Sequence, residues 1–240
     1  MLFARNGEGV RIEPSRGARG FCPQCGTETL AKCGELVSWH WAHRTRECDS
    51  WSEGESEWHL AWKRRVEPLA CEVVIGAHRA DIRTGSGLVV ELQHSPLAAG
   101  VIAEREAFYG ELVWIFDASQ FELELYPSGA QVTFTWRRPK KSLLSVTKPM
   151  YWDLGHDFAV HVVKLAPDPT LGGVRGAGVL LDTACLASAL FGECARPAVH
   201  ELARSRAQRV AACLTRAYEQ LRRAPGDGIG EALRRAMLEL

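Results

Sequence analysis

Two cysteines separated by two residues, in the segment 22–26 (CPQCG), impose the strongest constraint on how this chain folds. Such a turn directs both thiolates at one centre, and the glycine after it lets the backbone fold around them. Further candidate ligands follow at His40, His43 and Cys48. Zn²⁺ favours four nitrogen or sulfur ligands in a tetrahedron. The spacing therefore predicts a structural zinc held by Cys22, Cys25, His43 and Cys48. His40 is an alternative to either downstream ligand, His43 or Cys48.

The alternative is that these cysteines are ordinary buried thiols. Residues 1–50 contain few aliphatic side chains, so a packed core alone would not stabilise them and a bound metal is expected. Cys33 is a weaker candidate because residues 31–34 resemble the tip of a hairpin. No carboxylate accompanies the cluster, which favours a structural zinc over a catalytic one.

Composition places the chain among ordinary globular proteins, with 46% hydrophobic and 24% charged residues. The formal net charge is zero, so any binding to nucleic acid has to use a local basic surface. The sequence has no run of 18 apolar residues and no signal-peptide pattern. We therefore expect a cytoplasmic protein that makes no membrane contact, whose eight cysteines are thiols or metal ligands.

Changes in residue type divide the chain into three zones. Residues 1–50 form the zinc-ribbon-like Cys/His module, residues 51–138 the core, and residues 139–240 a region that we expect to be mostly helical. Helices are expected in the third zone at 182–190 and from Pro197 onward. One face of the helix expected from Pro197 carries five arginines, namely Arg204, Arg206, Arg209, Arg216 and Arg223. We expect this face to be solvated rather than to bind phosphates.

The middle zone alternates helical and strand patterns, which predicts an α/β fold. The helix over 55–66 stops before Pro68. The expected order is helix, three strands, helix and strand, at residues 55–66, 71–75, 78–83, 88–93, 98–109 and 111–116. Two further candidate strands extend the sheet, at 122–126 and 131–136.

Two carboxylates stand in apolar strand patterns, Asp81 and Glu91. Buried carboxylates are costly unless a cation neutralises them, and two oxygen ligands on adjacent strands suit Mg²⁺ or Mn²⁺. Gln93 points to the same side of its strand as Glu91. On the preceding helix, Glu55 or Glu57 supplies a further ligand, and His59 and Lys63 orient water or stabilise the phosphorane charge.

The simpler interpretation of Asp81 and Glu91 is a pair of solvent-facing residues on an amphipathic hairpin. The ordered context of an acidic helix, the strands and a second helix favours the metal site. Five tryptophans between residues 39 and 62 could stack on unpaired bases. We expect most of them to fill the interface between the Cys/His module and the first helix instead.

The residues of the core and of the module together resemble the CoiA-like competence family. The similarity lies in GESEWH with Lys63, in HRAD around Asp81, in VELQHSP around Glu91, and in the CPxC and HWAH segments near the N-terminus. The resemblance implies a PD-(D/E)XK nuclease core acting on DNA, with Asp81 and Glu91 as metal ligands. Gln93 stands where such nucleases usually have lysine. The segment from Arg105 to Tyr109 is similar to the QxxxY element of RecB-like nucleases, with arginine in place of glutamine.

These observations predict a Mg²⁺- or Mn²⁺-dependent deoxyribonuclease that acts on single- or double-stranded DNA, with recombination or helicase proteins as candidate partners. The second hypothesis is a non-catalytic accessory protein that binds single-stranded DNA on a degenerate nuclease fold, which the glutamine at position 93 favours. The third is an adaptor that binds another protein through its helical tail.

Overall fold

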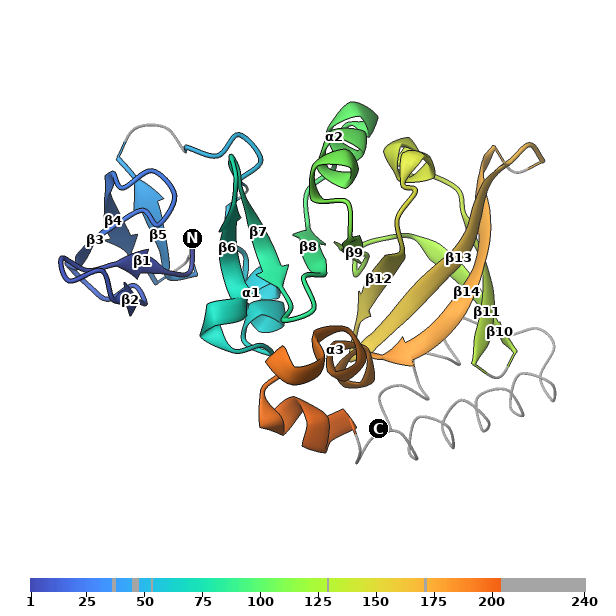
Figure 1. Ribbon diagram of the computed structural model, residues 1–240. Helices are drawn as coiled ribbons and strands as arrows, with labels where there is room; N and C mark the ends of the chain where they lie inside the picture. The colour runs from blue at the N-terminus through green and yellow to red at the C-terminus, as the bar shows by residue number, and fades with distance from the viewer. Residues whose placement is uncertain (36–37, 45–47, 53, 129, 171, 204–240) are drawn as a thin grey trace.

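The computed structural model describes residues 1–35, 38–44, 48–52, 54–128, 130–170 and 172–203. These residues form two sheets, a small one near the N-terminus and a large one that carries the helices (Figure 1). The chain is therefore a mixed α/β protein, as predicted, with more strand than helix. The small sheet has five strands in the order β2-β1-β3-β4-β5, namely β1 (Ala4–Arg5), β2 (Arg11–Ile12), β3 (Arg19–Phe21), β4 (Glu28–Lys32) and β5 (His40–His43).

The large sheet has nine strands in the order β10-β11-β14-β13-β12-β9-β8-β7-β6. Three neighbouring strands at its centre, β8, β9 and β12, run parallel, and the remaining pairs are antiparallel. The strands are β6 (Cys71–Ile75), β7 (His78–Arg83), β8 (Val89–Gln93), β9 (Leu112–Asp117), β10 (Leu123–Ser128), β11 (Gln131–Trp136), β12 (Met150–Gly155), β13 (Phe158–Asp168) and β14 (Gly173–Asp182).

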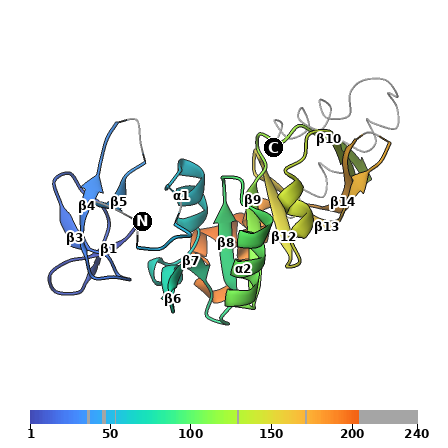
Figure 2. The ribbon, with the colours of Figure 1, turned by 90° about the horizontal axis from the view of Figure 1, so that it is seen from above.

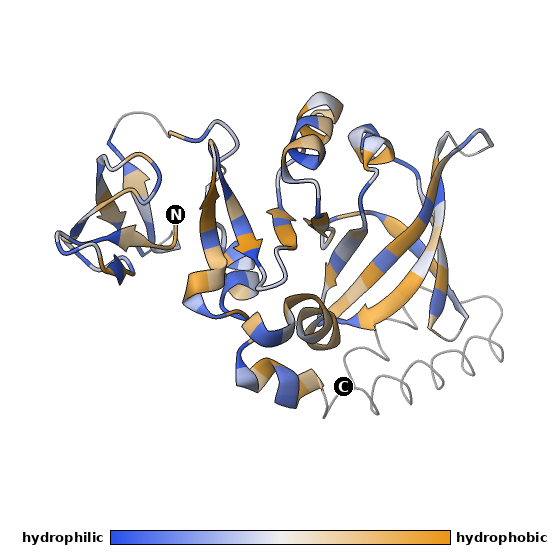
Figure 3. Cartoon of the chain, in the orientation of Figure 1, coloured by the Kyte–Doolittle hydropathy of each residue, from blue (hydrophilic) through white to orange (hydrophobic). Residues whose placement is uncertain are grey.

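Helices cover both faces of the sheet around β8 and β9. Helix α2 (Ala99–Tyr109) lies on one face, and α1 (Glu57–Lys63) and α3 (Thr183–Phe191) lie on the other (Figure 2). Val89 packs with α2, whereas Val90 packs with α1 and α3. Central strands buried on both faces read as continuous apolar runs, and apolar residues accordingly concentrate there and on α3 (Figure 3). Two core clusters result, one on each side of the sheet.

The predicted order of elements in the middle zone is confirmed as α1, β6, β7, β8, α2 and β9. Strands 71–75, 78–83 and 131–136 begin and end at the predicted residues, and the other elements differ from the prediction by at most three residues at either end. The first helix begins at Glu57 because Ser56 caps it: the Ser56 hydroxyl accepts from the His59 backbone N–H, and the His59 ring accepts from the Ser56 N–H.

The prediction that residues 139–240 are mostly helical is wrong for residues 150–182, which form β12, β13 and β14 and extend the same sheet. Glycines obscured the strand pattern of β14. A Cβ at Gly176 would lie 2.3 Å from the Phe134 ring and one at Gly178 would lie 2.3 Å from the His161 carbonyl oxygen, so close packing of neighbouring strands requires glycine there.

The helix predicted at 182–190 is confirmed as α3, and residues 197–203 are helical from the predicted Pro197. Asp182 caps α3, since its carboxylate accepts from the backbone N–H groups of Ala184 and Cys185. The arginine-bearing face predicted from Arg204 onward lies outside the described residues. In the part of the chain that the structure describes, no helix is both long and apolar enough to cross a membrane.

Candidate functional site

The four predicted zinc ligands come together in the small sheet. The ligand atoms of Cys22, Cys25, His43 and Cys48 all lie within 4.8 Å of one another. The Sγ atoms of Cys22 and Cys48 are 3.7 Å apart, and Cys25 Sγ is 3.3 Å from His43 Nε2. Tetrahedral zinc with ordinary bond lengths places two sulfurs about 3.8 Å apart and a sulfur and a nitrogen about 3.6 Å apart. The cluster therefore fits a structural metal such as zinc.

Local backbone structure explains why these four residues converge. Cys22 and Cys25 lie on the turn between β3 and β4, where the backbone N–H of Gly26 donates to the Cys22 carbonyl and Gly26 has a positive φ of 71°. His43 ends β5, which pairs with β4. The other histidine of this strand, His40, is directed at the Ser38 carbonyl oxygen, 2.7 Å from its Nδ1. His43 is thus the histidine of the cluster, and neither His40 nor Cys33 belongs to it.

The protein environment favours the thiolate at one ligand. Burial acts to raise the pKa of Cys25, but hydrogen bonds from Thr27 and His43 outweigh burial and lower that pKa to about 6. Metal ions bind thiolates rather than thiols. Cys25 therefore favours the thiolate form, which is the form that a metal ion binds.

A short strap, residues 48–52, leads from the last zinc ligand to the large sheet. The Asp49 carboxylate accepts from the Arg79 backbone N–H at 2.8 Å and lies 2.8 Å from His78 Nδ1. The Trp51 ring stacks on His78 with ring centroids 3.3 Å apart, and the Trp51 carbonyl accepts from Arg105 Nη2. The metal cluster is consequently tied to β7 and α2 within four residues of Cys48.

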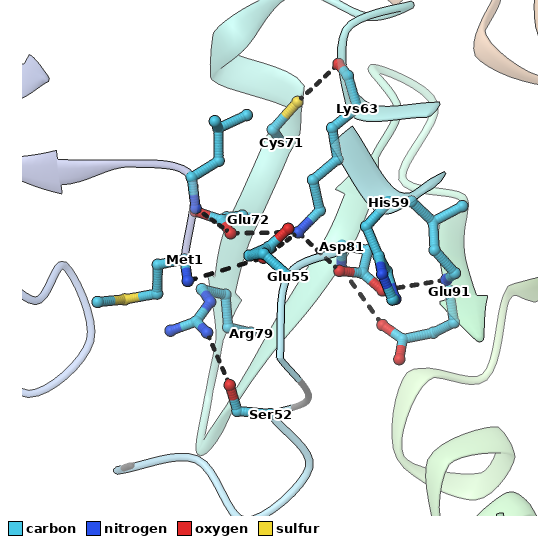
Figure 4. Close-up of polar contacts among 12 residues, drawn as sticks. Met1, Ser52, Glu55, His59, Lys63, Cys71, Glu72, Arg79, Asp81 and Glu91 are labelled. Atoms are coloured by element: carbon cyan, nitrogen blue, oxygen red, sulfur yellow. Dashed lines mark hydrogen bonds and ion pairs between the residues drawn. The ribbon is translucent and has the colours of Figure 1, made fainter. Parts of the chain in front are cut away.

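The predicted carboxylates meet where β7 and β8 cease to pair through their backbones. The ladder between these strands consists of Ile82 with Val90 and Arg83 with Val89. Beyond it, the Leu92 N–H donates to Asp81 Oδ2 at 3.0 Å, and the Asp81 N–H donates to Glu91 Oε1 at 3.3 Å (Figure 4). Side-chain oxygens thus replace backbone carbonyls, which holds the two carboxylates beside each other between the strands.

A buried lysine forms ion pairs with three acidic side chains of this site. Lys63 Nζ lies 2.8 Å from Glu55 Oε1, 3.0 Å from Asp81 Oδ1 and 3.2 Å from Glu72 Oε1 (Figure 4). Burial acts to lower the pKa of Lys63, but the three carboxylates raise it well above its usual value. Burial acts to raise the pKa of Asp81, and Lys63 outweighs it and lowers that pKa. Lys63 and Asp81 are therefore both charged.

The second carboxylate has a different partner. Arg105 Nη1 from α2 lies 2.9 Å from Glu91 Oε2, and both side chains are buried. Burial and the negative charge of Asp81 nevertheless raise the pKa of Glu91 to about 7, against the effect of Arg105. Burial and the charge of Asp81 together thus disfavour the ionised form of Glu91 more than Arg105 stabilises it, so an added cation would stabilise that form.

Glu72 is a member of this site that sequence reasoning missed. It has a φ of 48°, a left-handed conformation that is uncommon outside glycine. Its carboxylate accepts from the backbone N–H groups of Leu2 and Phe3 at 2.7 and 2.9 Å in addition to Lys63. The sequence feature that could have identified Glu72 is a charged residue next to an apolar run in β6, the strand that pairs with the Asp81 strand.

A cavity of about 30 Å³ lies beside Lys63, and its lining includes Glu55, Asp81, Glu91 and Arg105. Such a volume holds a water molecule or a small ion and excludes a sugar or a base. Three buried atoms of the cavity lining have no hydrogen-bond partner among the described residues: Glu55 Oε2, Arg79 Nη1 and Arg105 Nε. Buried polar groups are rarely left without a partner. The lining therefore suits a small polar or charged occupant.

The structure brings five of the six predicted catalytic residues to this cavity, namely Glu55, His59, Lys63, Asp81 and Glu91. Gln93 is buried near them but is absent from the described cavity lining, and its side-chain amide donates to the Ser95 carbonyl at 2.7 Å. The alternative acid Glu57 is exposed and accepts from the Ser38 hydroxyl, so Glu55 is the acid of the site. Arg79 and Arg105 join the site from β7 and α2.

Comparison of the chain with protein-family models, with curated proteins and with solved structures found no match. The similarity to the CoiA-like family therefore stays a prediction, and function has to be argued from the site.

The metal cluster predicts a difference between two cysteines of the same module. Replacing Cys48 with serine removes one of four ligands, so the purified protein is expected to hold zinc about 10-fold or more weakly. Replacing Cys33, which lies outside the cluster, is expected to leave zinc binding unchanged. Metal content by mass spectrometry and a chelator competition measure both. Full zinc retention by Cys48→Ser, or zinc loss in Cys33→Ser, would contradict the assignment.

The buried ammonium predicts a large stability loss on its removal. Lys63→Met leaves three carboxylates facing one another without their shared cation, and unfolding in urea is expected to show a loss of about 3–5 kcal/mol. Lys164→Met changes an exposed lysine and is expected to cost less than about 0.5 kcal/mol. Equal stability of the two variants would show that Lys63 does not hold the site together.

Proposed function

We propose that this protein is a metal-dependent deoxyribonuclease with a PD-(D/E)XK core. The observation that carries the proposal is the pair of carboxylates, half-buried Asp81 and buried Glu91, held side by side where β7 and β8 separate. The order helix, three strands, helix and strand, with β8 and β9 parallel, supports that core. The choice of DNA as substrate is supported by the resemblance of the site residues to the CoiA-like family.

The residues of the site fit a hard divalent cation. Carboxylate oxygens are the ligands that Mg²⁺ and Mn²⁺ prefer, burial and the charge of Asp81 raise the pKa of Glu91 despite Arg105, and Glu55 Oε2 has no partner in the described part of the chain. Asp81 and Glu91 would hold the ion, with Glu55 beside them. When bound, the ion would supply positive charge for a phosphate and lower the pKa of a coordinated water.

Charge balance makes cation and DNA binding depend on each other. The cavity is lined by three acids and three permanently basic side chains, namely Glu55, Asp81 and Glu91 with Lys63, Arg79 and Arg105. Glu72, which shares Lys63 from outside the lining, brings this group of side chains to one net negative charge. A divalent cation alone would still leave one uncompensated positive charge in a buried site, which is unfavourable. A phosphodiester brings one negative charge with it, so the ion is expected to bind more tightly together with DNA.

Each neighbouring side chain has a definable task. Lys63 keeps Asp81 ionised and fixed in place, and its three carboxylate contacts leave it poorly placed to activate water. His59 Nδ1 accepts a hydrogen bond from Ser56, which puts the ring proton on Nε2 and makes that atom a donor for a phosphate oxygen. Arg105 fixes Glu91 and the strap at once. The water-orienting role predicted for Gln93 remains a proposal.

A second candidate function is a non-catalytic accessory protein that binds single-stranded DNA. It is favoured by the fact that each carboxylate already has a basic partner, Lys63 for Asp81 and Arg105 for Glu91, and by glutamine rather than lysine at position 93. In this case the strap and the module hold the strand for a recombination protein or a helicase.

One experiment separates the two candidates. The wild-type protein is expected to cleave DNA with Mg²⁺ or Mn²⁺, tested on single-stranded, linear duplex and supercoiled substrates. Asp81→Asn and Glu91→Gln are each expected to slow cleavage about 100-fold or more, because each loses a metal ligand. Glu57→Gln, on the exposed face of α1, is the matched control and is expected to retain wild-type cleavage.

Folded, zinc-loaded wild-type protein that binds DNA and cuts none of these substrates would overturn the nuclease proposal. The accessory function would then be the better account. Cleavage that persists in both Asp81→Asn and Glu91→Gln would show that the activity lies elsewhere.

A further inference from the structure

Outside the cavity, a histidine–aspartate pair lies at the carboxyl ends of the parallel strands. His94 directly follows β8, and Asp117 is the last residue of β9, the neighbouring strand. The carboxyl ends of adjacent parallel strands are where open α/β sheets bind ligands. His94 Nδ1 lies 2.7 Å from Asp117 Oδ2, and the side chains are 49% and 8% exposed. An accessible imidazole is thus oriented by a buried carboxylate.

The aspartate of this pair is itself held in place. Asp117 Oδ1 accepts from the Ser119 backbone N–H at 3.0 Å and from the Ser119 hydroxyl at 2.7 Å. Burial acts to raise the pKa of Asp117, but these hydrogen bonds and His94 outweigh it and lower that pKa. An ionised Asp117 accepts the Nδ1–H of His94. The uncharged ring then carries its free lone pair on Nε2, the arrangement that a general base requires.

His94 stands one side chain away from the carboxylate cavity. His59 lines the cavity, and its ring centroid is 6.1 Å from that of His94. Trp58 lies beside His94 as well, at 6.3 Å between ring centroids. His94 is therefore adjacent to a side chain of the cavity lining, and bound water is needed to carry a proton from the cavity to it.

Most side chains that the structure describes in the cavity are cations or are held by one. Lys63, Arg79 and Arg105 are cations, Asp81 is bonded to Lys63, and Glu55 is bonded to Lys63 through Oε1 and keeps Oε2 without a partner. His59 Nδ1 is occupied by Ser56. Glu91 is paired with Arg105 and is a proposed cation ligand. Gln93, at the position where related nucleases are expected to have lysine, is an amide and cannot accept a proton.

We infer that His94 is the general base of the reaction and that Asp117 is its positioning residue, an inference that rests on the proposed nuclease function. A water molecule gives one proton to His94 Nε2 while its oxygen forms a bond to phosphorus. The bond from phosphorus to the sugar oxygen of the leaving strand breaks, and that oxygen takes a proton from solvent. His94 then releases its proton to solvent, which restores the starting state.

Titratable groups lie around His94 on the elements packed near it. Asp117 lies on β9 and His59 on α1. The neighbouring strand β12 contributes Asp153, whose Oδ2 accepts from Trp58 Nε1 and Trp62 Nε1 at 2.8 Å each. A general base acts in its deprotonated form, so cleavage is expected to increase with pH as His94 loses its proton and then to level off.

The test is the single-turnover cleavage rate with Mn²⁺ from about pH 5 to about pH 9. His94→Ala and His94→Gln are expected to slow cleavage about 100- to 10,000-fold at the plateau and to lose the histidine-dependent rise, with DNA affinity within about twofold of wild type. Added imidazole is expected to restore part of the rate in His94→Ala. Asp117→Asn is expected to slow cleavage about 10-fold or more, because it no longer fixes the ring tautomer. His156→Asn, at an exposed turn, is the control.

Wild-type rates and an unchanged pH profile in the His94 variants would overturn the inference. So would a defect confined to DNA affinity, or an undiminished rate in Asp117→Asn. If the wild type cleaves and requires Asp81 while His94→Ala cleaves equally well, only this inference fails. A wild type that cleaves under no condition removes the nuclease proposal and this inference together.

Discussion

The ion pairs of the Lys63 ammonium hold the candidate site and its surroundings together. Three carboxylates from three parts of the chain meet this one group: Glu55 before α1, Glu72 on β6 and Asp81 on β7. Buried acids so close together are tolerated only because a cation lies among them. Glu72 extends the network to the backbone of residues 2 and 3, so the N-terminal strand region and the large sheet share the same charged centre.

A second connection runs from the metal cluster to the other carboxylate. Arg105 binds Glu91 and also the Trp51 carbonyl, and Asp49 anchors the same strap on β7. Cys48, the last ligand of the cluster, immediately precedes this strap. A structural metal at the cluster would therefore stabilise one wall of the cavity, although the cluster lies outside that cavity. The small module is in this sense part of the site rather than an appended domain.

Local sequence patterns predicted much of this structure. The remaining features depend on contacts between distant elements, which local patterns do not reveal. The zinc ligands follow from a short-range turn and a strand pairing, and the elements of the middle zone follow from alternation and helix-breaking residues. Neither pattern shows that Lys63 would lie among three acids or that Arg105 would reach Glu91, because those contacts depend on how distant elements pack. Strand β14 was missed because close strand packing at Gly176 and Gly178 requires residues with low strand propensity.

We propose above that Asp81 and Glu91 form a cation site that DNA completes. Calorimetric titration of Ca²⁺, which occupies oxygen sites, into wild type and Asp81→Asn, each with and without a short DNA strand, tests it directly. The account predicts weak binding to wild-type protein alone, binding at least about 10-fold tighter with DNA present, and no such binding in Asp81→Asn. Equal cation binding by both proteins, or binding by wild type that DNA does not strengthen, would contradict it.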